Sequence, residues 1–321
     1  MFNAVQPARP TAHAKTTLKP WRAALIGMMA ATPSLAVAVA AFAHPAPVQS
    51  PAAFASDRLS VEVLGQGPDV ILIPGFASSR EVWRAEAERL SAAHRVHLVQ
   101  LAGFAGEPWA HGQGGPFLAP VVGELERYIR ERGLKRPAVI GHSMGGLLSL
   151  MLADAAPEAV SRVMSVDSLP FFGALFGPTA TPETVRPAAQ ATAAAILSAD
   201  EATFRRQQAQ TAIGLARSPA AREAMVEWSM ASDRQALAAA ISEVMTTDIG
   251  PRLSGIRVPV TAVYAADADG GAPAAMADAM WANAYAALPD KTLVRVDGSR
   301  HFIMADQPAR FAEAVDAFLA E

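Results

Sequence analysis

The chain of 321 residues contains no cysteine and only 18% charged residues. The lack of cysteine excludes disulfides, lipidated cysteine, iron–sulfur clusters, cysteine-ligated zinc and a cysteine nucleophile. With 51% hydrophobic residues and a net charge of −3, the chain is too apolar and too weakly charged to be disordered throughout. The same weak negative charge argues against strong nucleic-acid binding. The length is sufficient for one large domain with a buried core.

Acidic residues are absent from the first 43 positions. Basic residues occur before position 23, and the uncharged residues 23–43 end in the small-residue pattern Ala-Phe-Ala. This arrangement predicts a secretory signal peptide at 1–43, with an uncleaved membrane anchor as the alternative. A second Ala-Phe-Ala lies at 53–55, within a segment rich in proline and alanine that predicts a disordered linker over 44–56. We expect residues 57–321 to be periplasmic or secreted, without stable membrane insertion once the signal is cleaved.

Apolar runs and alternating patterns from residue 57 onward predict strands alternating with helices. The expected strands are 58–64, 69–73, 94–101, 137–140, 162–166, 259–264 and 292–296, and the helices between and after them are 81–93, 120–133, 144–155 and 308–319. This order predicts a mostly parallel sheet with helices on both faces. Residues 170–250 lack strand patterns and contain helical stretches at 182–197, 200–215 and 233–246. We expect this insertion to form a helical cap over the carboxyl edge of the sheet, where ligands bind in such folds.

One motif carries the chemistry. Gly141-His142-Ser143-Met144-Gly145 follows the buried strand 137–140 and opens an apolar helix. G-x-S-x-G between a strand and a helix is the nucleophile elbow, in which a tight turn lifts the serine hydroxyl above the sheet. The N–H that follows the serine, at Met144, then faces the developing oxyanion, and the helix N-terminus favours negative charge there. Ser143 is therefore the predicted nucleophile.

A serine nucleophile needs a base within hydrogen-bond reach. His301 is the candidate, because it follows the last expected strand and precedes the closing helix. His142 lies inside the elbow and is expected to shape the pocket. The other histidines fall in the export segment, the linker, a strand or a surface loop. They are His13, His44, His94, His97 and His111.

The third group should be a carboxylate that follows a strand and orients the imidazole. Asp267 is the first candidate, since it comes directly after the strand 259–264. Asp269 and Asp167 are the alternatives, and Asp167 closes the strand 162–166. The second oxyanion donor is expected in the loop after the strand 69–73, at the N–H of Phe76, because Gly75 lets the backbone approach.

These motifs resemble the α/β-hydrolase family, in family order, over about residues 58–320. The resemblance rests on Gly-His-Ser-Met-Gly-Gly at 141–146, the Pro-Gly-Phe loop at 74–76, Leu-Ala-Gly-Phe-Ala-Gly at 101–106 and Gly-Ser-Arg-His-Phe at 298–302. It implies an eight-stranded, mostly parallel sheet with a helical cap, and the roles above for Ser143, His301, Phe76 and Met144. Many members have Gly-x-x-Asp after the acid-bearing strand, where this chain has Ala-Ala-Asp-Ala-Asp at 265–269. The acid therefore stays open between the three aspartates.

We expect a serine hydrolase that cleaves a carboxylic ester through an acyl-enzyme. An acyltransferase with the same acyl-enzyme and a non-catalytic binding protein are the alternatives. Family members that act as dehalogenases and epoxide hydrolases carry an aspartate nucleophile, so the serine disfavours those reactions. Phe171, Phe172 and Trp228 in the cap, together with His142, are candidates to bind an apolar acyl or aromatic small-molecule ester, although the cap residues would also suit its own packing core. The sequence predicts no metal and no cofactor.

Overall fold

A computed structural model of the chain describes residues 54–111 and 115–320. The predicted signal peptide lies outside the described residues, as do residues 44–53 of the predicted linker. Of the linker residues that the structure describes, Phe54 packs on the domain. The ring of Phe54 contacts Tyr128 edge-on at 5.0 Å between centroids, and the guanidinium of Arg127 lies 4.2 Å from the Phe54 ring centre.

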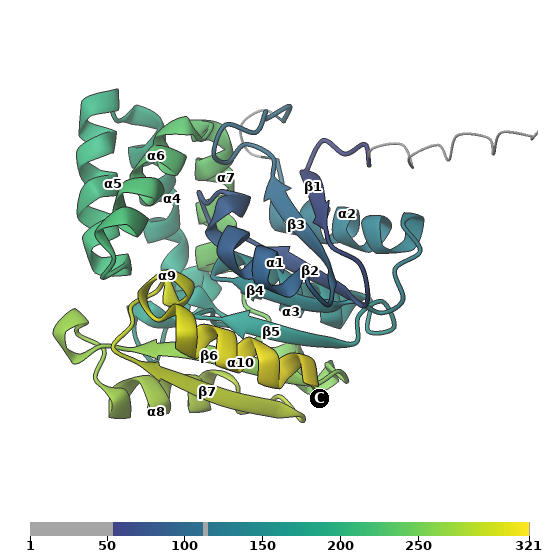
Figure 1. The fold of residues 1–321 in the computed structure, drawn as a ribbon. Coiled ribbons are helices and arrows are strands. Elements are labelled where there is room, and N and C mark those ends of the chain that lie inside the picture. Colours follow the sequence, from purple (N-terminus) through teal and green to yellow (C-terminus); the bar gives the residue numbers. More distant parts are fainter. Residues whose placement is uncertain (1–53, 112–114, 321) are drawn as a thin grey trace, which may run out of the picture. The chain divides into compact units, whose positions relative to one another are not determined.

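The described residues form one seven-stranded sheet (Figure 1). Its strands are β1 (Leu59–Leu64), β2 (Asp69–Ile73), β3 (Arg95–Leu101), β4 (Ala138–His142), β5 (Arg162–Val166), β6 (Val260–Ala266) and β7 (Lys291–Asp297). Their order across the sheet is β1-β3-β2-β4-β5-β6-β7. Only β1 runs antiparallel to its neighbour, β3, so the mostly parallel α/β class is confirmed with one strand fewer than the family resemblance implies. Each of the seven strands corresponds to a segment that the sequence predicts.

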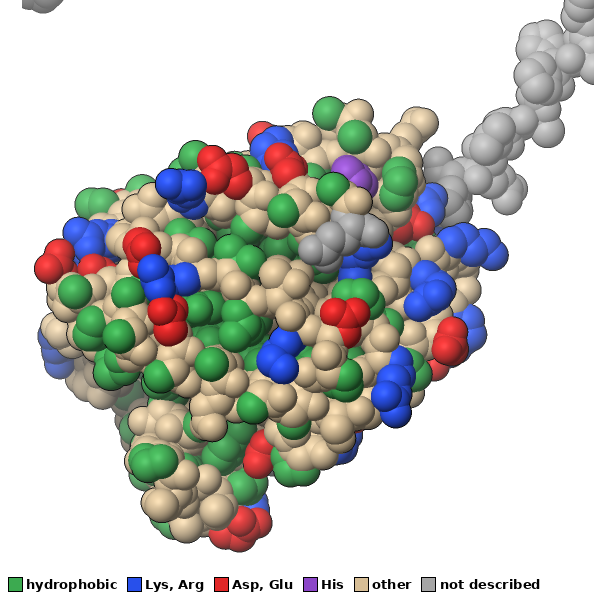
Figure 2. Space-filling model, turned by 90° about the horizontal axis from the view of Figure 1, so that it is seen from below, with side chains coloured by type: hydrophobic (Ala, Val, Ile, Leu, Met, Phe, Trp, Pro, Cys, Tyr) green, Lys and Arg blue, Asp and Glu red, His purple; other side chains and the backbone are tan. Residues whose placement is uncertain are grey.

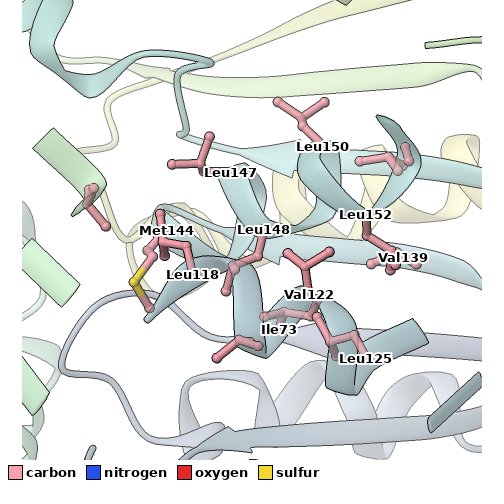
Figure 3. Close-up of a cluster of buried hydrophobic side chains, with 14 of the residues drawn as sticks. Ile73, Leu118, Val122, Leu125, Val139, Met144, Leu147, Leu148, Leu150 and Leu152 are labelled. Atoms are coloured by element: carbon pink, nitrogen blue, oxygen red, sulfur yellow. The ribbon is translucent and has the colours of Figure 1, made fainter. Parts of the chain in front are cut away.

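Helices cover both faces of the sheet. The helical segments outside the cap are η1 (Arg80–Trp83), α1 (Arg84–Leu90), α2 (Leu118–Glu131), α3 (Met144–Ala155), η3 (Gly250–Gly255), η4 (Ala268–Gly270), α8 (Ala274–Ala284), α9 (Ile303–Asp306) and α10 (Pro308–Ala320). Side chains of α2, α3 and α8 pack on one face, and those of α1, α9 and α10 pack on the other. In Figure 3, the leucines of α3 lie among Ile73 and Val139 of the sheet and the apolar stripe of α2. This packing buries the helix that begins at Met144 and so fixes the turn before it.

The cap consists of helices joined by short loops, as the sequence predicts. It contains η2 (Phe172–Phe176), α4 (Pro182–Ser198), α5 (Glu201–Leu215), α6 (Pro219–Ala231) and α7 (Arg234–Thr246). Helix α6 is not among the helices expected from sequence. It begins after an N-cap at Ser218, whose hydroxyl accepts from the Ala221 N–H, with proline at the first helical position. Two pairs of cap helices pack together, α4 with α7 and α5 with α6.

Figure 2 shows one face of the molecule, on which acidic and basic side chains are interspersed. Hydrophobic side chains are exposed at several places on this face, most densely left of its centre. Of the helices in the described ranges, none is both long and apolar enough to span a bilayer.

Candidate active site

Ser143 occupies a strained turn between β4 and α3. Its backbone has φ +55° and ψ −123°, a conformation that residues other than glycine rarely adopt. The Ser143 N–H donates to the carbonyl of Val166 at 2.9 Å, so the pairing of β4 with β5 extends into the turn. A Cβ at Gly141 would lie 2.1 Å from the Gly145 carbonyl oxygen, and no side chain fits there. The local packing therefore requires glycine beside the serine, and the surrounding sheet holds the strain.

His301 lies in the loop after β7 and contacts Asp167, the residue that directly follows β5. His301 Nδ1 and Asp167 Oδ2 are 2.7 Å apart. The other oxygen, Asp167 Oδ1, accepts the Ala265 N–H at 2.9 Å, which fixes the carboxylate. Because Nδ1 is engaged, Nε2 is the nitrogen left for Ser143, and both residues line the same cavity. The structure brings together a serine, an imidazole and an orienting carboxylate.

Asp267, the first candidate for the acid, is engaged elsewhere. Its Oδ1 accepts from Arg217 Nη1 at 2.7 Å and its Oδ2 from Arg300 Nε at 3.0 Å. Burial alone would raise the pKa of this carboxyl, but the hydrogen bonds and charges of Arg300 and Arg217 hold the pKa below its ordinary value. Asp269 is 80% exposed and lies 3.6 Å from Arg217. Within the described ranges, neither aspartate bonds to His301, and Asp167 is the candidate of the three that does.

His142 bonds to the backbone of the loop that carries His301. The side chain is fully buried, and its Nε2 lies 3.0 Å from the backbone carbonyl oxygen of His301. A carbonyl only accepts, so Nε2 carries the proton. Burial, and to a lesser extent the charge of His301, lowers the pKa of His142 well below its ordinary value, and the ring stays neutral. His142 lies at the wall of the cavity, as the sequence predicts, and its hydrogen bond also positions the His301 loop.

The two predicted oxyanion donors lie beside Ser143. Met144 is the first residue of α3, so its N–H has no carbonyl partner within the helix. Gly75 and Phe76 line the cavity together with Ser143. A Cβ at Gly75 would lie 3.0 Å from both Ser143 Cβ and His142 Nδ1, so the backbone before Phe76 passes close to the elbow. This geometry is suited to two N–H groups that face one oxygen.

A cavity of about 670 Å³ lies between the loops at the carboxyl edge of the sheet and the cap. Cap helices provide most of its wall. The cap residues that line it are Phe172, Ala191, Thr192, Ala195, Ile196, Gln207, Gln208, Thr211, Leu215, Met225, Ser229, Ile241 and Val244. Phe172 is thus placed as predicted, whereas Phe171 and Trp228 are not among the described residues of the wall. Phe171 packs instead beside the buried cluster of Val185, Ala189 and Met245.

The glutamines and threonines of the wall come from positions that sequence reasoning did not single out. Thr192 of α4 lines the cavity, together with Gln207, Gln208 and Thr211 of α5. In the sequence, only the spacing of these residues along each helix could have indicated that they share a face. Across residues 54–111 and 115–320, no cluster of three histidine, aspartate or glutamate side chains is arranged to hold a metal ion.

The model of the alpha/beta hydrolase family matches residues 70–314, and the chain belongs to this family. A hydrolase from Pseudomonas aeruginosa has the same fold, with a TM-score of 0.68 and 20% identity over 82% of this chain and 94% of that one. The family match therefore covers the elbow, the cap and strands β2 to β7 except the first residue of β2, but not β1.

Two relatives carry the name pimeloyl-[acyl-carrier protein] methyl ester esterase. The protein from Aeromonas salmonicida is 34% identical over 114 residues, which is 36% of this chain and 43% of that relative. The protein from Vibrio atlanticus is 27% identical over 215 residues, which is 65% of this chain and 80% of that relative. The chain thus matches less than half of the Aeromonas protein and most of the Vibrio protein.

Proposed function

We propose that this protein hydrolyses a carboxylic ester through an acyl-enzyme on Ser143, with His301 as base and Asp167 as the orienting acid. The observation that carries the proposal is the 2.7 Å contact between His301 Nδ1 and Asp167 Oδ2, beside a serine held in a strained elbow. The esterase names of the relatives and the apolar part of the cavity wall support an ester with an apolar acyl group.

The chemistry follows from these groups. Ser143 Oγ attacks the ester carbonyl carbon as its proton passes to His301 Nε2. The N–H groups of Met144 and Phe76 stabilise the tetrahedral oxyanion. The carbon–oxygen bond to the alcohol then breaks, and the alcohol leaves with the proton from His301. Water attacks the acyl-enzyme, gives a proton to His301, and releases the carboxylic acid as Ser143 regains its proton.

The test is hydrolysis of p-nitrophenyl esters of increasing acyl length by the full-length protein and by Ser143→Ala. We expect activity in the parent and a near-complete loss in the variant, with the preferred chain length reporting the depth of the cavity. Equal rates in the two proteins would remove Ser143 as the nucleophile. Adding an acceptor alcohol and measuring the ester product separates hydrolysis from acyl transfer.

We also propose that the protein is exported, with cleavage after Ala43 rather than Ala55. The packing of Phe54 on Tyr128 supports the first site, because cleavage after Ala55 would remove that contact. Mass spectrometry of the protein from a periplasmic or extracellular fraction gives its N-terminus. A mature chain that begins at His44 is expected, and an intact N-terminus in the membrane fraction would support the anchor instead.

A further inference from the structure

The turn between α5 and α6 of the cap rests on the loop that carries His301. The Phe302 N–H donates to the Leu215 carbonyl at 3.1 Å. The Asp306 carboxylate accepts the N–H groups of Arg217 at 2.8 Å and Ser218 at 2.9 Å. These bonds join the residue after the catalytic histidine to the end of a cap helix.

Side chains reinforce this junction. Asp267 lies between Arg217 of the cap and Arg300 of the His301 loop, and its side chain is only 5% exposed. The Arg300 N–H donates to Asp306 at 3.0 Å, and its guanidinium donates to the Ile213 carbonyl in α5. We call Arg217, Asp267, Arg300 and Asp306 the cap clamp. It contains two cations and two anions, so its charges balance within the group.

The clamp holds the same helix pair that forms one wall of the cavity. Gln208, Thr211 and Leu215 of α5 and Met225 of α6 line the cavity, and α5 and α6 pack against each other. Residues of α4 and α7 line the cavity as well. Because both helix pairs contribute to the wall, the position of α5 and α6 affects how much room is left above Ser143.

We propose that Arg217 and Asp267 are positioning residues that fix the α5–α6 wall on the His301 loop and thereby determine the length of acyl group that the site accepts. This inference rests on the proposed function for its substrate. In the described ranges, Asp267 bonds through its side chain to the two arginines and not to the serine or the catalytic histidine. Asp267 therefore affects the reaction only through the position of the α5–α6 wall.

The first test compares Arg217→Gln with the parent on p-nitrophenyl acetate and p-nitrophenyl octanoate. We expect KM for the octanoate to rise about fivefold, a coupling effect of ordinary size, while KM for the acetate changes little because the short acyl group does not reach the wall. Arg217→Lys should restore the parental value, since one N–H to Asp267 suffices. Arg217 is 44% exposed, and its replacement is compatible with folding.

The matched control is Arg205→Gln. Arg205 lies on α5 and pairs with Glu227 of α6 at 2.6 Å, an exposed contact within the same helix pair that does not reach the His301 loop. Both esters should keep their parental KM in this variant. A rise for the octanoate of the same size in Arg205→Gln, or an equal rise for both esters in Arg217→Gln, would overturn the proposal.

Hydrogen exchange supplies a readout that needs no substrate. Backbone amides of residues 207–231 should exchange faster in Arg217→Gln and in Asp267→Asn than in the parent or in Arg205→Gln. Unchanged exchange in both clamp variants would show that the clamp does not hold the wall. If the parent cleaves neither ester, the proposed function fails and the acyl-length role fails with it, whereas the exchange data still decide whether the clamp fixes the helices.

Discussion

The exchange of one carboxylate for an amide distinguishes Asp167 from Asp267, two of the three aspartates that the sequence left open. In Asp167→Asn, the Ala265 N–H still requires an acceptor at the position of Oδ1, which places the amide oxygen there. The amide NH₂ then faces His301 Nδ1, where the carboxylate oxygen lies at 2.7 Å in the parent. Nδ1 must accept rather than donate, so the proton moves to Nε2 and the base loses its free lone pair.

The expected loss is large. A wrong tautomer of the catalytic histidine costs about 10⁴-fold in kcat in the serine protease in which this exchange has been made, and we expect a loss of that order for Asp167→Asn. Asp267→Asn is the matched control, because the same chemical change there breaks contacts to Arg217 and Arg300 and none to His301. Its kcat on p-nitrophenyl acetate should fall by far less.

The assay is steady-state hydrolysis of p-nitrophenyl acetate at pH 8, with circular dichroism to confirm that both variants are folded. The reasoning is refuted if Asp167→Asn keeps more than about a tenth of the parental kcat while Asp267→Asn loses activity by the larger factor. That result would identify Asp267 as the acid. It would also mean that His301 exchanges its contact with Asp167 for one with Asp267 during the reaction.

Three further results are expected. Ser143→Gly should unfold at a higher temperature than Ser143→Ala, because glycine relieves a strained φ that costs about 1–3 kcal/mol, and equal melting temperatures would argue against strain. Gly145→Ala should be strongly destabilised in urea, since its Cβ would lie 2.3 Å from the Ile73 carbonyl oxygen, whereas Gly123→Ala, with open space around it, should be slightly stabilised. The folded chain keeps His142 neutral while the unfolded chain binds a proton below its ordinary pKa of 6.5, so the free energy of unfolding should fall as pH drops below that value, and less steeply in His142→Gln.

Much of the fold could be predicted because its signals are local. Buried parallel strands give continuous apolar runs, and the elbow has a fixed order of strand, turn and helix. Helix α6 also had a local signal, Ser218-Pro219, which marks an N-cap and first helical position. Helix α8, in contrast, is rich in alanine, and its sequence gives no clear apolar stripe.

The acid could not be predicted, because the choice depends on residues far away in the sequence. Both Asp167 and Asp267 directly follow a parallel strand at the same edge of the sheet. Arg217 and Arg300, which are 50 and 33 positions from Asp267, are what engage it. Local patterns identify residues that can reach a site, but only the tertiary structure shows which carboxylate is paired with which cation.

The pairing of α5 with α6 has a consequence for how this enzyme can diversify. The two helices form an insertion within the cap, which is itself an insertion between β5 and β6. A change of length or composition at residues 201–231 would remodel one wall of the cavity, while the strands that carry Ser143 and Asp167 keep their register. The substrate range of such a scaffold can therefore drift by exchanging one helical hairpin, provided that its turn still fits the loop of the catalytic histidine.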